Sequence, residues 1–161
     1  MAFQVFLVPS LNPSEQASIW QLQTLAQAYE LTLKTARRTR QALLSAVDAA
    51  EINRSDAVVV IVTRPLGDRA VAEIKAATKV RKPLYFLVER TLATTVSRLG
   101  LVRHPNIVPF DREEGIEGVA KQIRRAVQKD KTSKEMQTTL GWLLGIGAAL
   151  FVLGSLASTE N

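Results

Sequence analysis

Over the first 110 residues, short apolar runs alternate with longer segments in which apolar residues recur every three or four positions. The runs predict β-strands, and the recurring positions predict amphipathic α-helices. Five strands are expected, at residues 3–9, 31–36, 56–63, 82–89 and 107–110. The third run, "DAVVVIVT", holds six consecutive apolar residues, mostly β-branched, which is typical of a central strand buried on both faces.

Helices are expected after the strands, at residues 14–29, 39–53, 70–81, 91–99 and 114–129. In the second helix, Leu43, Val47 and Ala50, with Leu44 as a further candidate, form the expected buried stripe. Trp20 is expected to pack along the edge of the first helix. Strict alternation with short loops predicts an α/β fold, in which a five-stranded parallel sheet carries helices on both faces. The expected strand order is 2-1-3-4-5, as in flavodoxin-like folds.

The segment "TTLGWLLGIGAALFVLGSLA", Thr138 to Ala157, holds 20 residues without a charge. As a helix it would be about 30 Å long, which matches the hydrocarbon core of a bilayer. A buried core helix is the alternative, but such a helix normally shows a polar stripe, and this segment has none. The segment therefore predicts a single transmembrane helix and, because only residues 158–161 follow it, a tail anchor.

Basic side chains concentrate just before this segment, where residues 121–134 hold six basic residues and one acidic residue. The positive-inside rule places the preceding domain on the cytoplasmic side, with the basic stretch against the anionic headgroups of the lipid bilayer. Because the net charge of +6 is so unevenly spread, no nucleic-acid partner is expected. Gly141 and Gly145 have the G-x-x-x-G spacing of self-associating spans, although small residues are common in spans generally. The expected organisation is an α/β domain, a basic linker, the span and a short tail, at residues 1–130, 131–137, 138–157 and 158–161.

Several familiar kinds of site are excluded by the residues that are absent. The chain has no cysteine and a single histidine, His104, so disulfides, thiolate chemistry and multi-histidine metal sites are excluded, and no metal is expected. The G-x-G-x-x-G dinucleotide fingerprint, the G-K-[ST] of a P-loop and the G-x-S-x-G nucleophile elbow are also absent. Hydroxyl, basic and carboxylate groups remain as the candidate chemistry.

Parallel sheets of this kind bind ligands at the carboxyl ends of their strands, near the switch point between strands one and three. Six candidate ligand-binding residues follow strands at this edge: Ser10, Arg37, Arg38, Thr63, Arg64 and Asp68. The arginines are candidates for binding phosphate. For the segment "KTARRTR" at residues 34–40, a solvated basic turn is the alternative.

Glu73 is the acid best placed for chemistry, at the border of the apolar stripe expected for the helix at 70–81. Its neighbours on the helix are alanines and a valine, so the carboxylate is expected to lose hydration and its pKa to rise. Such a group is suited to act as a nucleophile or a base. The alternative is an ordinary ion pair with Arg69, Arg81 or Lys82.

Three segments together carry a family resemblance: "FQVFLVPS", "INRSDAVVVIVT" and "AVAEIKAATKVRKPLYFLVE". Over roughly residues 2–127 the chain resembles the nucleoside 2-deoxyribosyltransferase-like and TIR-like superfamily. In that superfamily a helix after the third strand carries a glutamate that attacks or stabilises the sugar carbon of an N-glycosidic bond. Glu73 matches this position, so the resemblance implies that Glu73 is catalytic.

The resemblance also implies a nucleotide as ligand or substrate, NAD in the case of a TIR-type hydrolase, with no further cofactor. Ser10 and Thr63 would then orient the ribose, and Arg64 or Arg37 would hold phosphate. A role in signalling or defence follows by analogy with the family. The alternative is a non-catalytic, membrane-bound interaction or sensor module with a degenerate nucleotide pocket.

Overall fold

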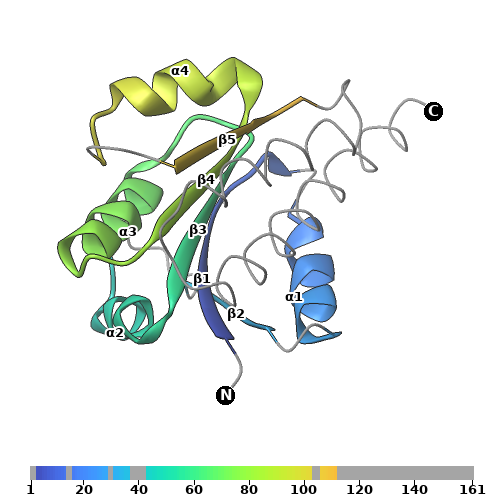
Figure 1. Ribbon diagram of the computed structural model, residues 1–161, viewed down its shortest axis with the longest axis vertical. Coiled ribbons are helices and arrows are strands. Elements are labelled where there is room, and N and C mark those ends of the chain that lie inside the picture. The colour runs from blue at the N-terminus through green and yellow to red at the C-terminus, as the bar shows by residue number, and fades with distance from the viewer. Residues whose placement is uncertain (1–2, 14–15, 29–30, 37–42, 103–105, 112–161) are drawn as a thin grey trace.

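Five strands form one parallel sheet in the computed structural model (Figure 1). The residues that the structure describes are 3–13, 16–28, 31–36, 43–102 and 106–111. The strands are β1 (Phe3–Ser10), β2 (Leu31–Thr35), β3 (Ala57–Val62), β4 (Leu84–Glu89) and β5 (Asn106–Phe110). Their order in the sheet is β2-β1-β3-β4-β5, which confirms the predicted order. All six residues of β3 are buried, so the predicted central strand is confirmed as well.

The described helices are α1 (Ser18–Ala28), α2 (Ala46–Arg54), α3 (Asp68–Lys79) and α4 (Arg90–Arg98). Figure 1 shows α1 on one face of the sheet and α2, α3 and α4 on the other. The predicted α/β architecture, with helices on both faces of the sheet, is therefore confirmed for the described residues.

The core consists of two apolar clusters, one on each face of the sheet. Because successive strand residues point to opposite faces, neighbouring residues of β3 belong to different clusters. Val59 packs in the cluster that includes Leu22 of α1. Val60 packs in the cluster that includes Ile52 of α2 and Ile74 of α3. Helices α2 and α3 therefore pack on the same face of the sheet, and polar side chains of the two helices meet there.

Helix α2 begins later than the sequence pattern predicts. The expected start was residue 39, but the helix begins at Ala46, and Leu43 and Leu44 precede it. The cause is Ser45, which has extended backbone geometry and whose hydroxyl accepts a hydrogen bond from the backbone N–H of Asp48 at 3.1 Å. An N-cap of this kind satisfies a backbone donor that the first turn leaves unpaired, so it fixes the start of the helix.

The buried stripe predicted for α2 was wrong for three of its four residues, while Leu44, the further candidate, is partly buried against the core. Leu43 is 79% exposed and Val47 is 49% exposed, and Ala50 is exposed too. The helix buries Asp48 and Ile52 instead. Ile52 is the apolar anchor of α2, and Asp48 is an acid that enters the interior because it has polar partners there.

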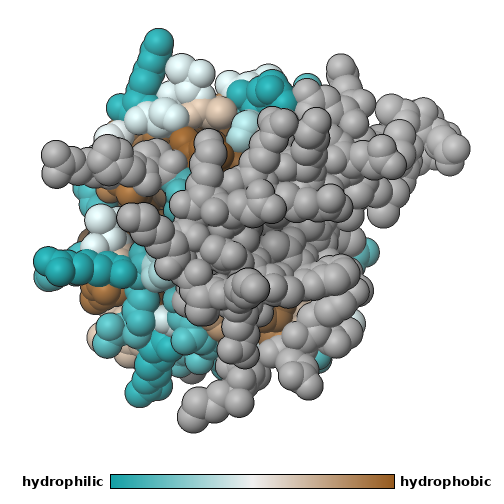
Figure 2. Space-filling view, viewed as in Figure 1, coloured by the Kyte–Doolittle hydropathy of each residue, from teal (hydrophilic) through white to brown (hydrophobic). Residues whose placement is uncertain are grey.

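Over α2, α3 and α4, the part of the surface that Figure 2 shows carries hydrophilic side chains with hydrophobic areas between them. Val80 and Leu99, with Val47, are among the exposed large apolar residues of the described segments. Scattered exposure of this kind is ordinary on protein surfaces. The apolar burial of these helices is therefore on the side that faces the sheet.

The predicted helix at 114–129 and the predicted span at 138–157, which contains Gly141 and Gly145, lie outside the described residues. Among the helices that the structure does describe, none combines the length and the apolar character needed to cross a membrane. The predicted span therefore stays a prediction from the sequence.

The position of α2 gives a test with an internal control. Ile52→Ala is expected to lower the free energy of unfolding by about 2–5 kcal/mol, because the side chain is fully buried and a cavity would remain. Val47→Ala, on the same helix but half exposed, is expected to cost no more than about 0.5 kcal/mol. Denaturant unfolding of the two variants measures both values. Equal losses would contradict the observed face of α2.

Candidate functional site

A cavity of about 630 Å³ lies at the carboxyl ends of β1, β2 and β3, on the switch-point side of the sheet. Its lining residues come from β1, the turn before α1, α1, the end of β2, the loop after β3 and the first turns of α3: Pro9, Ser10, Gln16, Ile19, Trp20, Gln23, Thr35, Ala36, Arg64, Gly67, Arg69, Ala70 and Glu73. The volume falls within the range of about 300–1,000 Å³ that is typical of small-molecule sites. The cavity is where the topology of the sheet predicts a ligand.

Glu73 is a wall residue of this cavity, although only 3% of its surface is exposed. Helix α3 presents it on the same side as Ala70, Ile74 and Ala77, which are also buried. Burial raises the pKa of the Glu73 carboxyl to about 7, while the neighbouring Arg69 lowers it and Asp48 raises it. The predicted desolvation of Glu73 is therefore confirmed.

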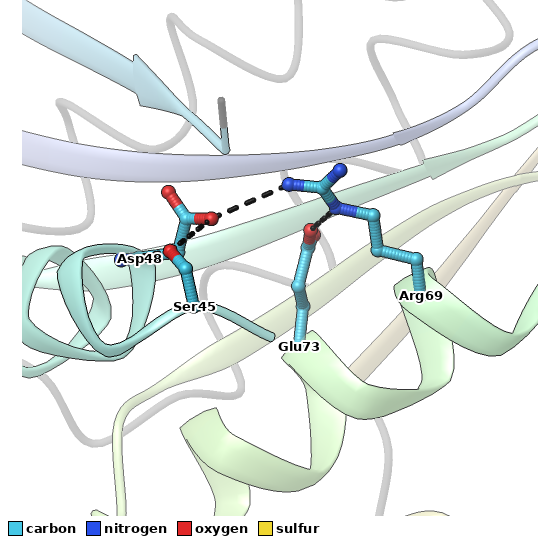
Figure 3. A network of polar contacts seen from close by, with 4 residues as sticks. All are labelled: Ser45, Asp48, Arg69 and Glu73. Carbon is cyan, nitrogen blue, oxygen red and sulfur yellow. Dashed lines mark hydrogen bonds and ion pairs between the residues drawn. The ribbon is translucent and has the colours of Figure 1, made fainter. Parts of the chain in front are cut away.

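The ion pair weighed as the alternative is present too. Arg69 Nε donates to Glu73 Oε1 at 3.3 Å, one helical turn away on α3. The same guanidinium donates from Nη2 to Asp48 Oδ2 of α2, also at 3.3 Å (Figure 3). One cation thus bridges two buried carboxylates from two helices. Burial disfavours the ionised form of Glu73 more strongly than this single shared cation favours it.

Ser45 completes the network from the cap of α2. Its hydroxyl donates to Asp48 Oδ2 at 2.8 Å, so this oxygen is held by both Ser45 and Arg69 (Figure 3). Asp48 is only 2% exposed, and buried carboxylates need such partners to remain in place. In the described ranges, no group of three or more acidic, histidine or cysteine side chains is arranged to hold a metal ion.

The raised pKa has a defined effect on stability. In the folded chain Glu73 holds its proton up to about pH 7, whereas in the unfolded chain it releases the proton near pH 4.5. The contribution of Glu73 to the free energy of unfolding is therefore highest below pH 4.5, where Glu73 is protonated in both states, and it falls as the pH rises from 4.5 through 7. The loss amounts to about 3 kcal/mol, because one pKa unit corresponds to about 1.4 kcal/mol.

The other predicted site residues lie at different places. Ser10 and Arg64 line the cavity with Glu73, while Thr63 and Asp68 are not among the lining residues. The Ser10 hydroxyl lies 3.4 and 3.3 Å from the carbonyl oxygens of Arg64 and Pro65, to which it donates. Arg37, Arg38 and His104 lie outside the described residues.

Thr63 belongs to the scaffold that joins two loops at this edge. Its hydroxyl oxygen accepts a hydrogen bond from the backbone N–H of Asn12 at 3.1 Å, and its backbone carbonyl accepts one from the Asn12 side chain at 3.3 Å. Asp68 starts α3 and is exposed. The ligand-binding roles predicted for these two residues stay predictions.

The sequence reasoning missed three residues of this region. Asp48 was not singled out, although "SAVD" at residues 45–48 has the S-x-x-D spacing of a capping box and marks a helix start. Arg69 was considered only as an ion-pair partner of Glu73. Trp20 was expected to pack along the edge of α1, but it is 73% exposed and lines the cavity. Trp20 does not lie on the apolar stripe of α1, and this position in the sequence pattern was the signal that its side chain is exposed.

No protein-family model matches the chain, and no curated protein matches it. Among solved structures, the chain is similar to the TIR domains of the activated Roq1 resistosome, a complex that directly recognizes the pathogen effector XopQ. The similarity covers 92% of this chain and 84% of that chain, with 9% sequence identity and a TM-score of 0.48. The chemistry of the site therefore rests on its own residues.

Titration of Glu73 tests the network. With the glutamate side chains labelled with ¹³C, the Glu73 carboxyl signal is expected to titrate near pH 7, and Glu73→Gln identifies that signal. Asp48→Asn is expected to lower the pKa of Glu73, because it removes a neighbouring negative charge. Arg69→Met is expected to raise this pKa, because it removes the cation.

Glu89→Gln is the matched control, since Glu89 is also an acid of raised pKa but lines no part of the cavity. This variant is expected to leave the titration of Glu73 unchanged. In denaturant unfolding, the wild-type chain should lose stability between pH 5 and pH 8, and Glu73→Gln should reduce that loss. A pKa of Glu73 near 4.5 would contradict the described environment.

Proposed function

We propose that the domain binds a nucleotide or a related N-glycoside in the cavity and that Glu73 acts on the sugar carbon of its N-glycosidic bond. One observation carries the proposal: a buried carboxyl group of raised pKa stands in the wall of a ligand-sized cavity at the switch point of the sheet. Perturbed acids in clefts are typical of functional sites. NAD and 2′-deoxynucleosides are the proposed substrates.

The proposed reaction breaks the bond between the sugar carbon and the base nitrogen, and the electron pair leaves with the base. The Glu73 carboxylate stabilises the positive charge that develops on the sugar carbon, or forms a glycosyl ester with it. Water then adds its hydroxyl to the sugar carbon. Its proton goes to the departing base of a 2′-deoxynucleoside, which leaves as an anion, or to the solvent in the case of NAD, whose nicotinamide leaves neutral. A pKa near 7 keeps an appreciable share of Glu73 ionised at neutral pH.

The remaining lining residues fit the parts of such a ligand. Arg64 is exposed at the cavity and offers a cationic group for phosphate, a role also proposed for Arg37 and Arg38. Ser10 is the proposed contact of the ribose. Trp20 offers an exposed aromatic surface in the cavity wall, against which a planar base can stack.

A second function is supported by the ion pair between Arg69 and Glu73. In this alternative the domain is a binding or sensor module without turnover, and Glu73 serves to hold Arg69 in place. Both functions need an occupied cavity, but only the first needs Glu73 to reach the sugar carbon.

Release of free base from NAD or from 2′-deoxynucleosides separates the two functions. The full-length chain, in liposomes, is expected to release base, and Glu73→Gln is expected to reduce the rate by about a hundredfold or more, because the reacting group is lost. Chromatographic detection of nicotinamide or of the free base measures the rate.

Glu89→Gln serves as the control for this assay, because it removes an acid at the same edge of the sheet that does not line the cavity. It is expected to retain the wild-type rate. Ligand binding without base release would support the sensor function. Release that persists in Glu73→Gln would overturn the catalytic role of Glu73.

We further propose that residues 138–157 attach this domain to a membrane as a single-pass helix, with the domain on the cytoplasmic side. The support is the uncharged 20-residue segment and the basic stretch before it. Self-association through Gly141 and Gly145 would bring several domains together, in keeping with a signalling or defence role.

Alkaline carbonate extraction of membranes that contain the full-length chain tests the proposed span. The wild-type chain is expected to remain in the membrane pellet. The double variant Leu144→Arg/Leu150→Arg is expected to be extracted, because each central arginine costs about 2.5–3.5 kcal/mol on insertion scales. Ser133→Arg, which adds a charge in the linker, is the control and is expected to stay in the pellet. Extraction of the wild-type chain would refute the span.

A further inference from the structure

Of the three charged side chains in the Asp48–Arg69–Glu73 network, that of Arg69 is the most exposed, and Arg69 lines the cavity. The side chain of Arg69 is 24% exposed, whereas those of Asp48 and Glu73 are 2% and 4% exposed. The two acids are thus nearly covered, and the Arg69 side chain is the accessible member of the network. Arg64 is also exposed and lines the same cavity, so two arginine side chains belong to its wall.

Arg69 is held from two sides. Its Nε bonds Glu73 on its own helix, and its Nη2 bonds Asp48 on α2, which is itself fastened to the Ser45 cap. A guanidinium is planar and presents its donors in a fixed fork, so anchoring two of its nitrogens orients the whole group. A fork oriented in a cavity wall is suited to bind an oxyanion such as a phosphate.

We propose that Arg69 is the oxyanion-binding residue of the cavity, and that the phosphate group of the ligand competes with Glu73 for it, so that ligand binding favours the protonated form of Glu73. The inference rests on the proposed function, because it takes from it that the ligand carries a phosphate group. It adds a residue that sequence reasoning assigned to no ligand, and it joins recognition of the ligand to the state of the candidate catalytic acid.

The coupling follows from the charges that face Glu73. Among the described residues these are Arg69 on α3 and Asp48 on α2. Arg64, in the loop after β3, lines the same cavity, to which β1 and β2 contribute the uncharged Ser10 and Thr35. An incoming anion adds a negative charge beside Glu73 and draws on its cation. Both effects raise the pKa of Glu73, which already lies near 7. By linkage, the anion must then bind more tightly at low pH than at high pH.

Inorganic sulfate is the probe, because it resembles phosphate and keeps its charge across neutral pH. Sulfate binding to the full-length chain is measured by calorimetry at constant ionic strength in chloride, and the ¹³C signal of Glu73 is followed in the same titration. The wild-type affinity is expected to fall about fivefold from pH 6 to pH 8. Saturating sulfate is expected to move the Glu73 titration to higher pH.

Variants assign the two roles. Arg69→Met is expected to weaken sulfate binding about tenfold. Arg69→Lys, which keeps the charge but loses the fork, is expected to bind with intermediate affinity, and it serves in place of Arg69→Met if that variant does not fold. Glu73→Gln is expected to bind sulfate with no fall in affinity between pH 6 and pH 8. Arg90→Met is the matched control, because Arg90 is an arginine at the same sheet edge that pairs with Asp111 and does not line the cavity.

Wild-type affinity in both Arg69 variants, a pH dependence that persists in Glu73→Gln, or no sulfate binding at all would overturn the proposal. These outcomes are separate from the base-release assay. Sulfate binding through Arg69 without base release would leave this proposal standing and remove the catalytic one. Base release with no sulfate effect on Glu73 would do the reverse.

Discussion

The interaction on which this site depends is the bridge that Arg69 makes between two buried carboxylates. It joins α2 to α3 through Asp48 and Glu73, on the face of the sheet where both helices are anchored by Ile52 and Ile74. Removing one member of such a network leaves an uncompensated buried charge, which is strongly destabilising. The bridge therefore determines both how the two helices sit together and which charge the cavity presents.

A structural role and a chemical role are not exclusive for this bridge. Replacing buried ion pairs with well-packed apolar residues is often neutral or stabilising, so stability alone gives a weak reason for three charged groups at this position. The raised pKa of Glu73 shows the cost directly, because burial acts against its ionised form despite the cation beside it. Arg69 and Glu73 lie in the wall of a cavity at the switch point of the sheet. A ligand site requires this position, whereas a contact that only joins two helices does not.

The sheet was predictable because its signals are local and strong. The β-branched run of β3 is typical of a strand buried on both faces, and strict alternation with helices favours a parallel sheet, for which 2-1-3-4-5 is one of the common orders. Glu73 was predictable for a related reason. Its small apolar neighbours lie on its own helix, so its burial follows from the register of α3 alone.

The partners of Glu73 were harder to predict, because they depend on contacts between helices. The apolar residues before and within α2, Leu43 and Val47, suggested a stripe that the structure leaves exposed, since the Ser45 cap starts the helix later and turns Asp48 inward. Hydrophobic periodicity cannot find a buried acid, because it counts such a residue as surface. Only the capping-box spacing pointed to the true start of α2.

Glu73 can react with a ligand only if the ligand reaches its carboxyl group. The side chain is nearly covered, and the group that lies on the cavity side with it is the guanidinium of Arg69. A ligand that left Arg69 in place would meet a cation, and the acid behind it would stay paired. A ligand with an oxyanion offers Arg69 a second partner, and the ion pair that shields Glu73 is weakened by the same event that fills the cavity. If the site is catalytic, a phosphate-bearing substrate such as NAD therefore frees Glu73 from its cation, and the freed carboxyl reacts through the share that stays ionised. A 2′-deoxynucleoside, which carries no phosphate, leaves the ion pair in place.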